Sequence, residues 1–418
     1  MQRFQLCHDV QGEIMNQYSP LDYIKIDIAN QYGLDKKTFP QRIAWVNSIK
    51  DLHSKTISAE KPPQYLAAVL ALEDAYACVP SGHLVGLDAC SSGITILGIL
   101  AGCHITSQNT GVIGNKRMDM YNQCTLAMND LLNSDITIPR ADVKKSQMTH
   151  YYGSKAMPKH IFGEDTNELI AFYEAQEMVA PGACIMMHEF LSSWQSYALE
   201  HSHTLPDGFH SIVPVLQKMK VKLEIDELNH QTLTYIYEDN IGSEEGLAVA
   251  ANMTHGIDGF LVRETVRRCN YDAEQLILVS ALLDKHYDTT YAAIGCSTHA
   301  IEQAAIDHGF ISLRGVEFIN EHNINQFSKA YRQELYHLIG EVMDEPSFPV
   351  LTIHDEFKCH PNYMNSLRKI YQNILGELAD STVGQQVIRE VRNDPTYVLN
   401  KLSNDLGDAI MKSEYFLS

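Results

Sequence analysis

The twenty residues 84–103, LVGLDACSSGITILGILAGC, carry a single charge, Asp88, and this stretch constrains the fold of the chain most strongly. Three interpretations are open: a membrane span with one polar residue, a core element with a paired acid, or an acid that holds a metal. Twenty residues can cross a bilayer, but four glycines and two serines dilute the apolar content, and an ionised acid in lipid is costly. We therefore expect a short core strand that ends at Asp88, followed directly by a helix.

Composition places the 418 residues among globular chains, with 45% hydrophobic and 20% charged residues. The nine cysteines are odd in number and scattered, and no CxxC pair occurs; the N-terminal residues lack the apolar segment of a signal peptide. These features predict a reduced, cytoplasmic setting. The formal net charge of −20 argues against nucleic-acid binding by charge alone, although basic residues gather between residues 140 and 160 and allow a basic groove.

Residues 139–152 predict a helix, because Pro139 suits a first helical position and Gly153 suits the residue just past the end. The side chains that recur at every fourth position, and so share one face, are Arg140, Lys144, Met148 and Tyr152. Two cations at this spacing suit a triphosphate, and an aromatic ring beyond them suits a base or a ribose. A solvated basic face is the alternative, which the spacing alone does not exclude.

A second apolar strand is predicted within residues 348–360, FPVLTIHDEFKCH, with a tight tip at residues 354–356 and a return strand. Asp355 then lies at the tip, as Asp88 lies at the end of the first strand. Two ionised carboxylates in a dry site repel each other and raise each other's pKa. Two Mg²⁺ ions that share them with a phosphate remove this repulsion, which makes both acids candidate metal ligands. A turn-capping role is the alternative for each acid alone.

These segments resemble the three catalytic motifs of the single-subunit RNA polymerases of bacteriophages and mitochondria. DACSSGITILGIL is similar to the first motif, RADVKKSQMTHYYGS to the second and IHDEF to the third, in the family's order. Shorter matches are DMY (119–121), TLPDGF (204–209), THGIDGFLVRETV (254–266) and the C-terminal AIMKSEYFLS. The resemblance covers residues 60–268 and 346–418.

The resemblance implies a helix-rich α+β fold, a right-hand polymerase with palm and fingers and a small antiparallel palm sheet. Residues 1–59 would form an N-terminal helical segment that contacts another subunit, residues 60–108 the first part of the palm, and residues 109–254 the fingers. Residues 255–418 would form the second part of the palm and a C-terminal foot, with an insertion at about residues 269–345.

The resemblance also implies a role for each motif residue. Asp88 and Asp355 would hold two Mg²⁺, with the Ala89 carbonyl as a further ligand. Lys144 would protonate the pyrophosphate leaving group, and Tyr152 would sense the ribose 2′-hydroxyl. The residues expected to bind the nucleotide are Arg140, Lys144, Met148, Tyr152, Gly153, Tyr121, His255 and Gly93.

Two positions favour ribonucleotides. DNA polymerases of the same superfamily place a bulky Glu five residues after the first catalytic Asp, where this chain has Gly93, and an aromatic residue four after the Lys, where it has Met148. Glu356 departs from the Ser that is usual in RNA polymerases, and nothing in the sequence explains it. A DNA polymerase of the related family is the first alternative, and a non-catalytic, polymerase-derived template-binding protein is the second.

One departure from the family predicts a second polypeptide. Only 87 residues precede Asp88, and they hold neither a thumb nor the family's Asp-x2-Gly-Arg palm motif. The chain thus resembles the larger, C-terminal-half catalytic subunit of the two-subunit RNA polymerase II of N-four-like bacteriophages, which implies a heterodimer acting in phage transcription in the cytoplasm of an infected bacterial host. The partner would supply the missing parts, and a single-stranded DNA-binding or template-recruiting protein could deliver the DNA template. No membrane partner is expected.

Weaker signals remain open. HSH (201–203) and HDEFKCH (354–360) contain metal-ligand residue types, but neither has a second pair at a zinc spacing. Arg263, Arg267 and Arg268 share roughly one helical face, and they either touch nucleic-acid phosphates or form surface salt bridges.

Overall fold

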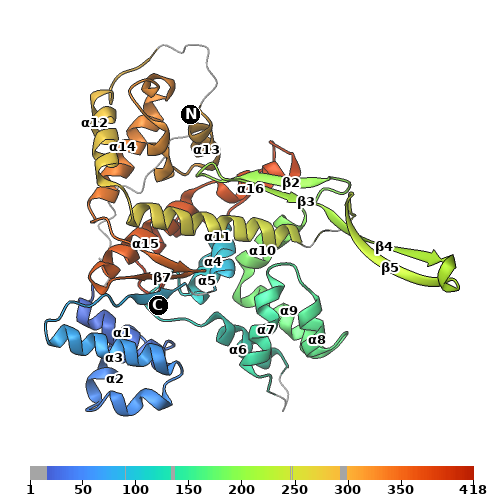
Figure 1. The fold of residues 1–418 in the computed structure, drawn as a ribbon, viewed down its shortest axis with the longest axis horizontal. Coiled ribbons are helices and arrows are strands. Elements are labelled where there is room, and N and C mark those ends of the chain that lie inside the picture. Colours follow the sequence, from blue (N-terminus) through green and yellow to red (C-terminus); the bar gives the residue numbers. More distant parts are fainter. Residues whose placement is uncertain (1–16, 90, 133–136, 245, 247, 292–298) are drawn as a thin grey trace.

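The computed structural model describes residues 17–89, 91–132, 137–244, 246, 248–291 and 299–418. Parts of the predicted N-terminal segment and of the predicted insertion, residues 1–16 and 292–298, lie outside the described residues. Helices dominate and the sheets are small and antiparallel, so the predicted helix-rich α+β class is confirmed (Figure 1).

The helices that position the central part of the molecule are α1 (Pro20–Tyr32), α2 (Phe39–Ser48), α3 (Pro62–Tyr76), α4 (Ser92–Leu100), α5 (His104–Asn109), α6 (Met120–Leu132), α7 (Arg140–His150), α8 (Ala156–Phe162), α9 (Asn167–Val179), α10 (Pro181–Leu191) and α11 (Ala248–Cys269). The later helices are α12 (Ala273–Lys285), α13 (Ala300–His308), α14 (Lys329–Met343), α15 (Met364–Asp380), α16 (Val383–Arg392) and α17 (Leu406–Ile410). The strands are β1 (Val85–Asp88), β2 (Glu200–Thr204), β3 (His210–Pro214), β4 (Leu216–Ile225), β5 (Gln231–Asn240), β6 (Leu351–Ile353) and β7 (Glu356–Cys359).

The central sheet joins two segments that lie far apart in the sequence. Its strand order is β1-β7-β6, and β7 runs antiparallel to both neighbours. Val85 and Leu87 of β1 and Phe357 of β7 are buried, so one face of the pair packs on the core. The tight β6–β7 turn holds His354 in the left-handed region, with φ of +55°. The predicted hairpin with Asp355 at its tip is therefore present.

The apolar run that follows Asp88 forms the buried helix α4. From Gly93 to Leu100 each residue of α4 is buried, and α10, α11 and α15 pack around it. The stretch is thus divided between β1 and α4, as the sequence predicts. None of the helices in the described part of the chain is both long and apolar enough to cross a membrane.

The N-terminal helices α1–α3 pack on one another and belong to the same hydrophobic core as the central sheet. Capping boxes at Ser19 and Thr38 set the starts of α1 and α2. In Figure 1 these helices lie below the sheet on one side, while α6–α9 lie on the other side. Residues of α1 and its neighbouring loops, and residues of α6 and α7, line the same cleft at the end of β1.

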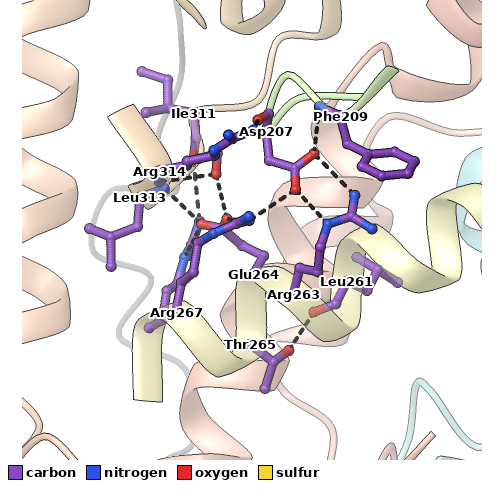
Figure 2. A network of polar contacts seen from close by, with 12 residues as sticks. Asp207, Phe209, Leu261, Arg263, Glu264, Thr265, Arg267, Ile311, Leu313 and Arg314 are labelled. Carbon is purple, nitrogen blue, oxygen red and sulfur yellow. Dashed lines mark hydrogen bonds and ion pairs between the residues drawn. The ribbon is translucent and has the colours of Figure 1, made fainter. Parts of the chain in front are cut away.

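Helices α12 and α14, with the short turns near them, form a second hydrophobic core that is separate from the main one. A network of buried charges joins this core to the body (Figure 2). Glu264 of α11 accepts hydrogen bonds from the Ser312 hydroxyl (2.5 Å) and the Leu313 N–H (2.8 Å), and Arg314 donates to the Asp207 carbonyl (2.7 Å).

The same network decides between the two interpretations of the α11 arginines. Asp207, in the turn between β2 and β3, is fully buried and accepts from Arg263 (2.7 Å) and Arg267 (3.0 Å) (Figure 2). Arg268 pairs with Glu264 and with Glu377 of α15. All three guanidinium groups thus form salt bridges within the protein.

One element was not expected. The strands β4 and β5 pair over ten residues each and form a ribbon that projects from the body (Figure 1). No residue of either strand is buried. The available signal was the strict alternation of apolar and charged residues over 218–225, KMKVKLEI, which is typical of a strand.

Candidate active site

A cleft of about 370 Å³ lies at the end of β1. Its walls come from the N-terminal helices, the central sheet, the segment before α6, and α7. The predicted site residues that line it are Asp88, Ala89, Tyr121, Arg140, Lys144, Met148 and Asp355. The structure therefore brings parts of all three motifs to one place.

Asp88 and Asp355 meet at this cleft because β1 and the β6–β7 tip lie side by side. The Ala89 N–H donates to the Asp355 carbonyl (3.2 Å), which fixes the two backbones relative to each other. The Asp88 carboxylate is open to the cleft, yet the surrounding protein desolvates it; this and repulsion from Asp355 and Glu356 raise its pKa to about 6. Carboxylate oxygens are the hard ligands that Mg²⁺ prefers, and the ion would offset the repulsion between the two acids. Asp88 and Asp355 therefore fit the metal.

A third acid, Asp258, was missed by the sequence reasoning. Burial and repulsion from Asp355 raise its pKa to about 6, so Asp258 lies near Asp355 although it does not line the cleft. Asp258 lies on α11 three residues after His255 and so on the same helical face. That spacing within THGID was the available signal.

Helix α7 presents its cations to the cleft as predicted. Pro139 is the residue before its first turn. Arg140 forms an ion pair with Asp119 (2.6 Å), and both Arg140 and Lys144 lie over the Tyr121 ring, each 5.5 Å from its centroid. Lys144 forms no ion pair within the part of the chain that the structure describes, so its ammonium group is available to an anion.

Tyr152, Gly93 and His255 form a cluster beside this cleft. The Tyr152 and His255 rings stack, with centroids 4.7 Å apart and planes inclined by 21°. A Cβ atom at Gly93 would lie 2.6 Å from the Tyr152 hydroxyl oxygen, so only glycine fits there without moving the ring. Gly153, with φ of +86°, makes the turn that follows Tyr152. Burial and the negative charge of Asp258 raise the pKa of Tyr152 to about 12, so its hydroxyl stays protonated.

Glu356 has a defined seat in the structure. It pairs with Asp88 across the β1–β7 ladder, and its carboxylate lies over Gly86, where a Cβ atom would be 2.3 Å from one of its oxygens. Lys358, two residues along β7, approaches the same carboxylate at 3.2 Å. A glutamate is thus accommodated because residue 86 has no side chain.

The last two residues of the chain, Leu417 and Ser418, contact the backbone of Asp88 and Ala89. The Ser418 N–H donates to the Asp88 carbonyl (3.0 Å), and Leu417 forms a bridge with Ala89. Leu417 is buried, and Ser418 lines the cleft. These contacts hold the backbone at the end of β1 in place.

The other metal-like patterns do not form a cluster among the described residues. His201 and His203 are buried in the β2–β3 pair, where burial lowers the pKa of both imidazoles. The three-ligand group that the described residues do contain is Glu224, Asp226 and His230, at the exposed turn of the β4–β5 ribbon. It lies outside the cleft and outside every motif.

Comparison with known proteins agrees with this geometry. The family model for DNA-dependent RNA polymerase matches residues 16–176, a range that includes Asp88 and α7. The DNA-directed RNA polymerase of Pseudomonas phage phiKMV is 22% identical in an alignment 311 residues long, which covers 60% of this chain and 38% of that relative. The chain therefore spans less than two fifths of that relative's length. Over residues 16–176, which include β1 with Asp88 and the basic helix α7, it is similar to the DNA-dependent RNA polymerases.

Proposed function

We propose that this chain is the catalytic palm-and-fingers subunit of a DNA-directed RNA polymerase, which adds ribonucleotides to an RNA 3′ end on a DNA template. The observation that carries the proposal is the single cleft in which Asp88 and Asp355 face the cations of α7. Similarity to the polymerase family over residues 16–176 supports it.

In this mechanism Asp88 and Asp355 would hold two Mg²⁺, with the Ala89 carbonyl as a further ligand. Bound there, the ions would offset charge on the triphosphate and make the 3′-hydroxyl more acidic. The 3′-hydroxyl loses its proton to solvent, its oxygen bonds to the α-phosphorus as the bond to the β-phosphate oxygen breaks, and pyrophosphate leaves. Lys144 binds the triphosphate and gives a proton to the departing pyrophosphate.

Two further groups of residues orient the nucleotide. Arg140 is held by Asp119 and reaches the triphosphate beside Lys144, while Tyr121 braces the nascent pair. Tyr152, stacked on His255, presents a protonated hydroxyl to the ribose. Because residue 93 has no side chain, the Tyr152 hydroxyl can lie over Gly93, in the space that a bulkier residue would fill. These contacts favour ribonucleotides.

The complete enzyme, in this proposal, is a heterodimer of the N-four-like type, active in phage transcription. A partner with a thumb and basic surface would offset the net charge of −20, which otherwise repels template. A template-recruiting protein would then bring single-stranded DNA to the cleft.

The test is nucleotide choice. An RNA primer annealed to a DNA template, given to the chain alone and to the complex purified from its native host, should be extended with ribonucleotides and Mg²⁺. A preference for deoxyribonucleotides would assign the chain to the DNA polymerases, whose HDE pattern it shares at residues 354–356.

A further inference from the structure

A buried polar cluster lies behind the basic helix. Gln147 of α7, Tyr151 just after it, and Gln176 of α9 are each at most 2% exposed. The Gln147 side-chain N–H donates to the Gln176 amide oxygen (2.8 Å), and the Tyr151 hydroxyl donates to the same oxygen (2.9 Å). The Gln176 N–H donates to the Cys124 thiol of α6. One amide therefore connects α6, α7 and α9.

Stability alone does not account for this cluster. A buried hydrogen bond adds only about 1 kcal/mol net, while a buried polar atom without a partner costs about 1–3 kcal/mol. Among the residues that the structure describes, the Gln147 amide oxygen has no hydrogen-bond partner, so part of the gain is lost. Apolar side chains of similar volume would stabilise this core at least as well. The polar cluster fixes the orientation of the helices, because a hydrogen bond is directional and each of these bonds forms in only one relative orientation of the helices.

The hydrogen bonds from Gln147 and Tyr151 to Gln176 fix the rotation of α7 about its own axis. A rotation of α7 by about 20° about its own axis, a fifth of the roughly 100° between successive residues, shows the size of the effect. A side-chain tip about 6 Å from the axis would move by about 2 Å under such a rotation. A misplacement of about 1 Å can cost roughly a hundredfold in rate. The two residues whose side chains donate to Gln176, Gln147 and Tyr151, directly precede Met148 and Tyr152.

We infer that Gln176 is a positioning residue for nucleotide selection: it fixes α7 through Gln147 and Tyr151 so that Lys144 faces the triphosphate and Tyr152 meets the ribose. The inference rests on the proposed function, because it assumes that α7 binds the incoming ribonucleotide. Neither glutamine belongs to the four-residue pattern of the basic face, so this role is additional to that of the motif.

The experiment compares Gln176→Met and Tyr151→Phe with a matched control, Tyr331→Phe. Tyr331 is also a buried tyrosine, but it lies in the second core, and its hydroxyl has no hydrogen-bond partner in the described part of the chain. Steady-state primer extension gives the KM for ribonucleotides and the ratio of kcat/KM between ribo- and deoxyribonucleotides; thermal unfolding gives stability. Gln176→Met and Tyr151→Phe should raise the KM about tenfold and lower the ratio, and Tyr331→Phe should change neither.

Two further variants separate positioning from folding. Gln176→Glu keeps an oxygen acceptor for both bonds and should restore most of the discrimination. The triple variant Gln147→Leu, Tyr151→Phe, Gln176→Leu replaces the cluster by apolar groups; it should unfold at about the normal temperature and still discriminate poorly.

Folded variants with unchanged KM and unchanged ratio would overturn the inference while leaving the proposed function intact. The proposed function has its own readout: calorimetric binding of ATP and extension by the unaltered protein. If that protein neither binds nor incorporates ribonucleotides, the proposed function fails, and the inference fails with it.

Discussion

Asp88 and Glu356 lie opposite each other in the β1–β7 pair, so the candidate metal ligand has a second carboxylate as its direct cross-strand neighbour. Such a pair of like charges is destabilising unless something compensates it. Lys358 approaches Glu356, and Gly86 leaves the space that the glutamate fills. Gly86, Glu356 and Lys358 of the sheet are therefore coupled to the pair Asp88 and Asp355.

Gly86→Ala should therefore act through Glu356. The added methyl group would lie 2.3 Å from a Glu356 oxygen, so the carboxylate at the end of this flexible side chain must move away, at a cost on the order of 1 kcal/mol or less. Combining it with Glu356→Ser should recover most of the loss, because serine is too short to clash. Denaturant unfolding of the two single variants and the double variant measures the coupling, and purely additive effects would contradict the contact.

The acidic pair predicts how stability depends on pH when no metal is present. The pKa of Asp88 rises from 3.8 to about 6 in the folded chain, so the protonated carboxyl favours the fold. This contribution is complete below about pH 4 and is lost as the pH rises through 6. In EDTA, Asp88→Asn should thus gain stability relative to the unaltered protein between pH 5 and 8.

Thermal unfolding across that pH range measures the effect. Added Mg²⁺ should stabilise the unaltered protein at pH 8, less so at pH 5.5, because protons compete with the metal for the carboxylate. The control is Asp284→Asn on the exposed side of α12, which should respond to neither. A Mg²⁺ effect that survives in Asp88→Asn would place the metal elsewhere.

The contact between Gly93 and Tyr152 predicts a change in nucleotide choice. In Gly93→Ala the methyl group would push the Tyr152 ring away, because only 2.6 Å separates the added atom from the hydroxyl oxygen. Use of ribonucleotides should fall about tenfold, a change of about 1.4 kcal/mol. Removing the hydroxyl with Tyr152→Phe should relieve the clash in the double variant. Competition between ribo- and deoxyribonucleotides gives the result, and an unchanged ratio in Gly93→Ala would refute the proximity argument.

The parts of the site that could be predicted from the sequence are those with a local pattern. Asp88 ends an apolar strand, Asp355 lies at the tip of a short hairpin, and the basic face of α7 repeats every four residues; each pattern spans fewer than twenty residues. Their meeting in one cleft was inferred from the family resemblance.

The remaining parts depend on contacts between distant segments. Asp258 comes near Asp355 only through the packing of α11 on the core helices α4, α10 and α15, and Gln176 reaches α7 only through the packing of α9. Arg263 and Arg267 donate hydrogen bonds to Asp207, which lies about sixty residues earlier in the chain. A helical pattern in the sequence does not reveal this pairing. The position of Glu356 follows from the pairing of β1 with β7, which brings its side chain over Gly86. Such relationships follow from tertiary structure and leave no periodic trace in the sequence.

The central claim is that the two motif acids make this cleft catalytic, and Asp355→Asn tests it most directly. The substitution keeps the size of the side chain but removes the charge that would hold Mg²⁺. Primer extension on single-stranded DNA is measured with the unaltered complex, with Asp355→Asn, and with Glu60→Gln, a carboxylate that lines the same cleft from the segment before α3. We expect a loss of at least about a thousandfold for Asp355→Asn, which is about 4 kcal/mol of transition-state stabilisation, and little change for Glu60→Gln. RNA synthesis by Asp355→Asn near the unaltered rate would contradict the account.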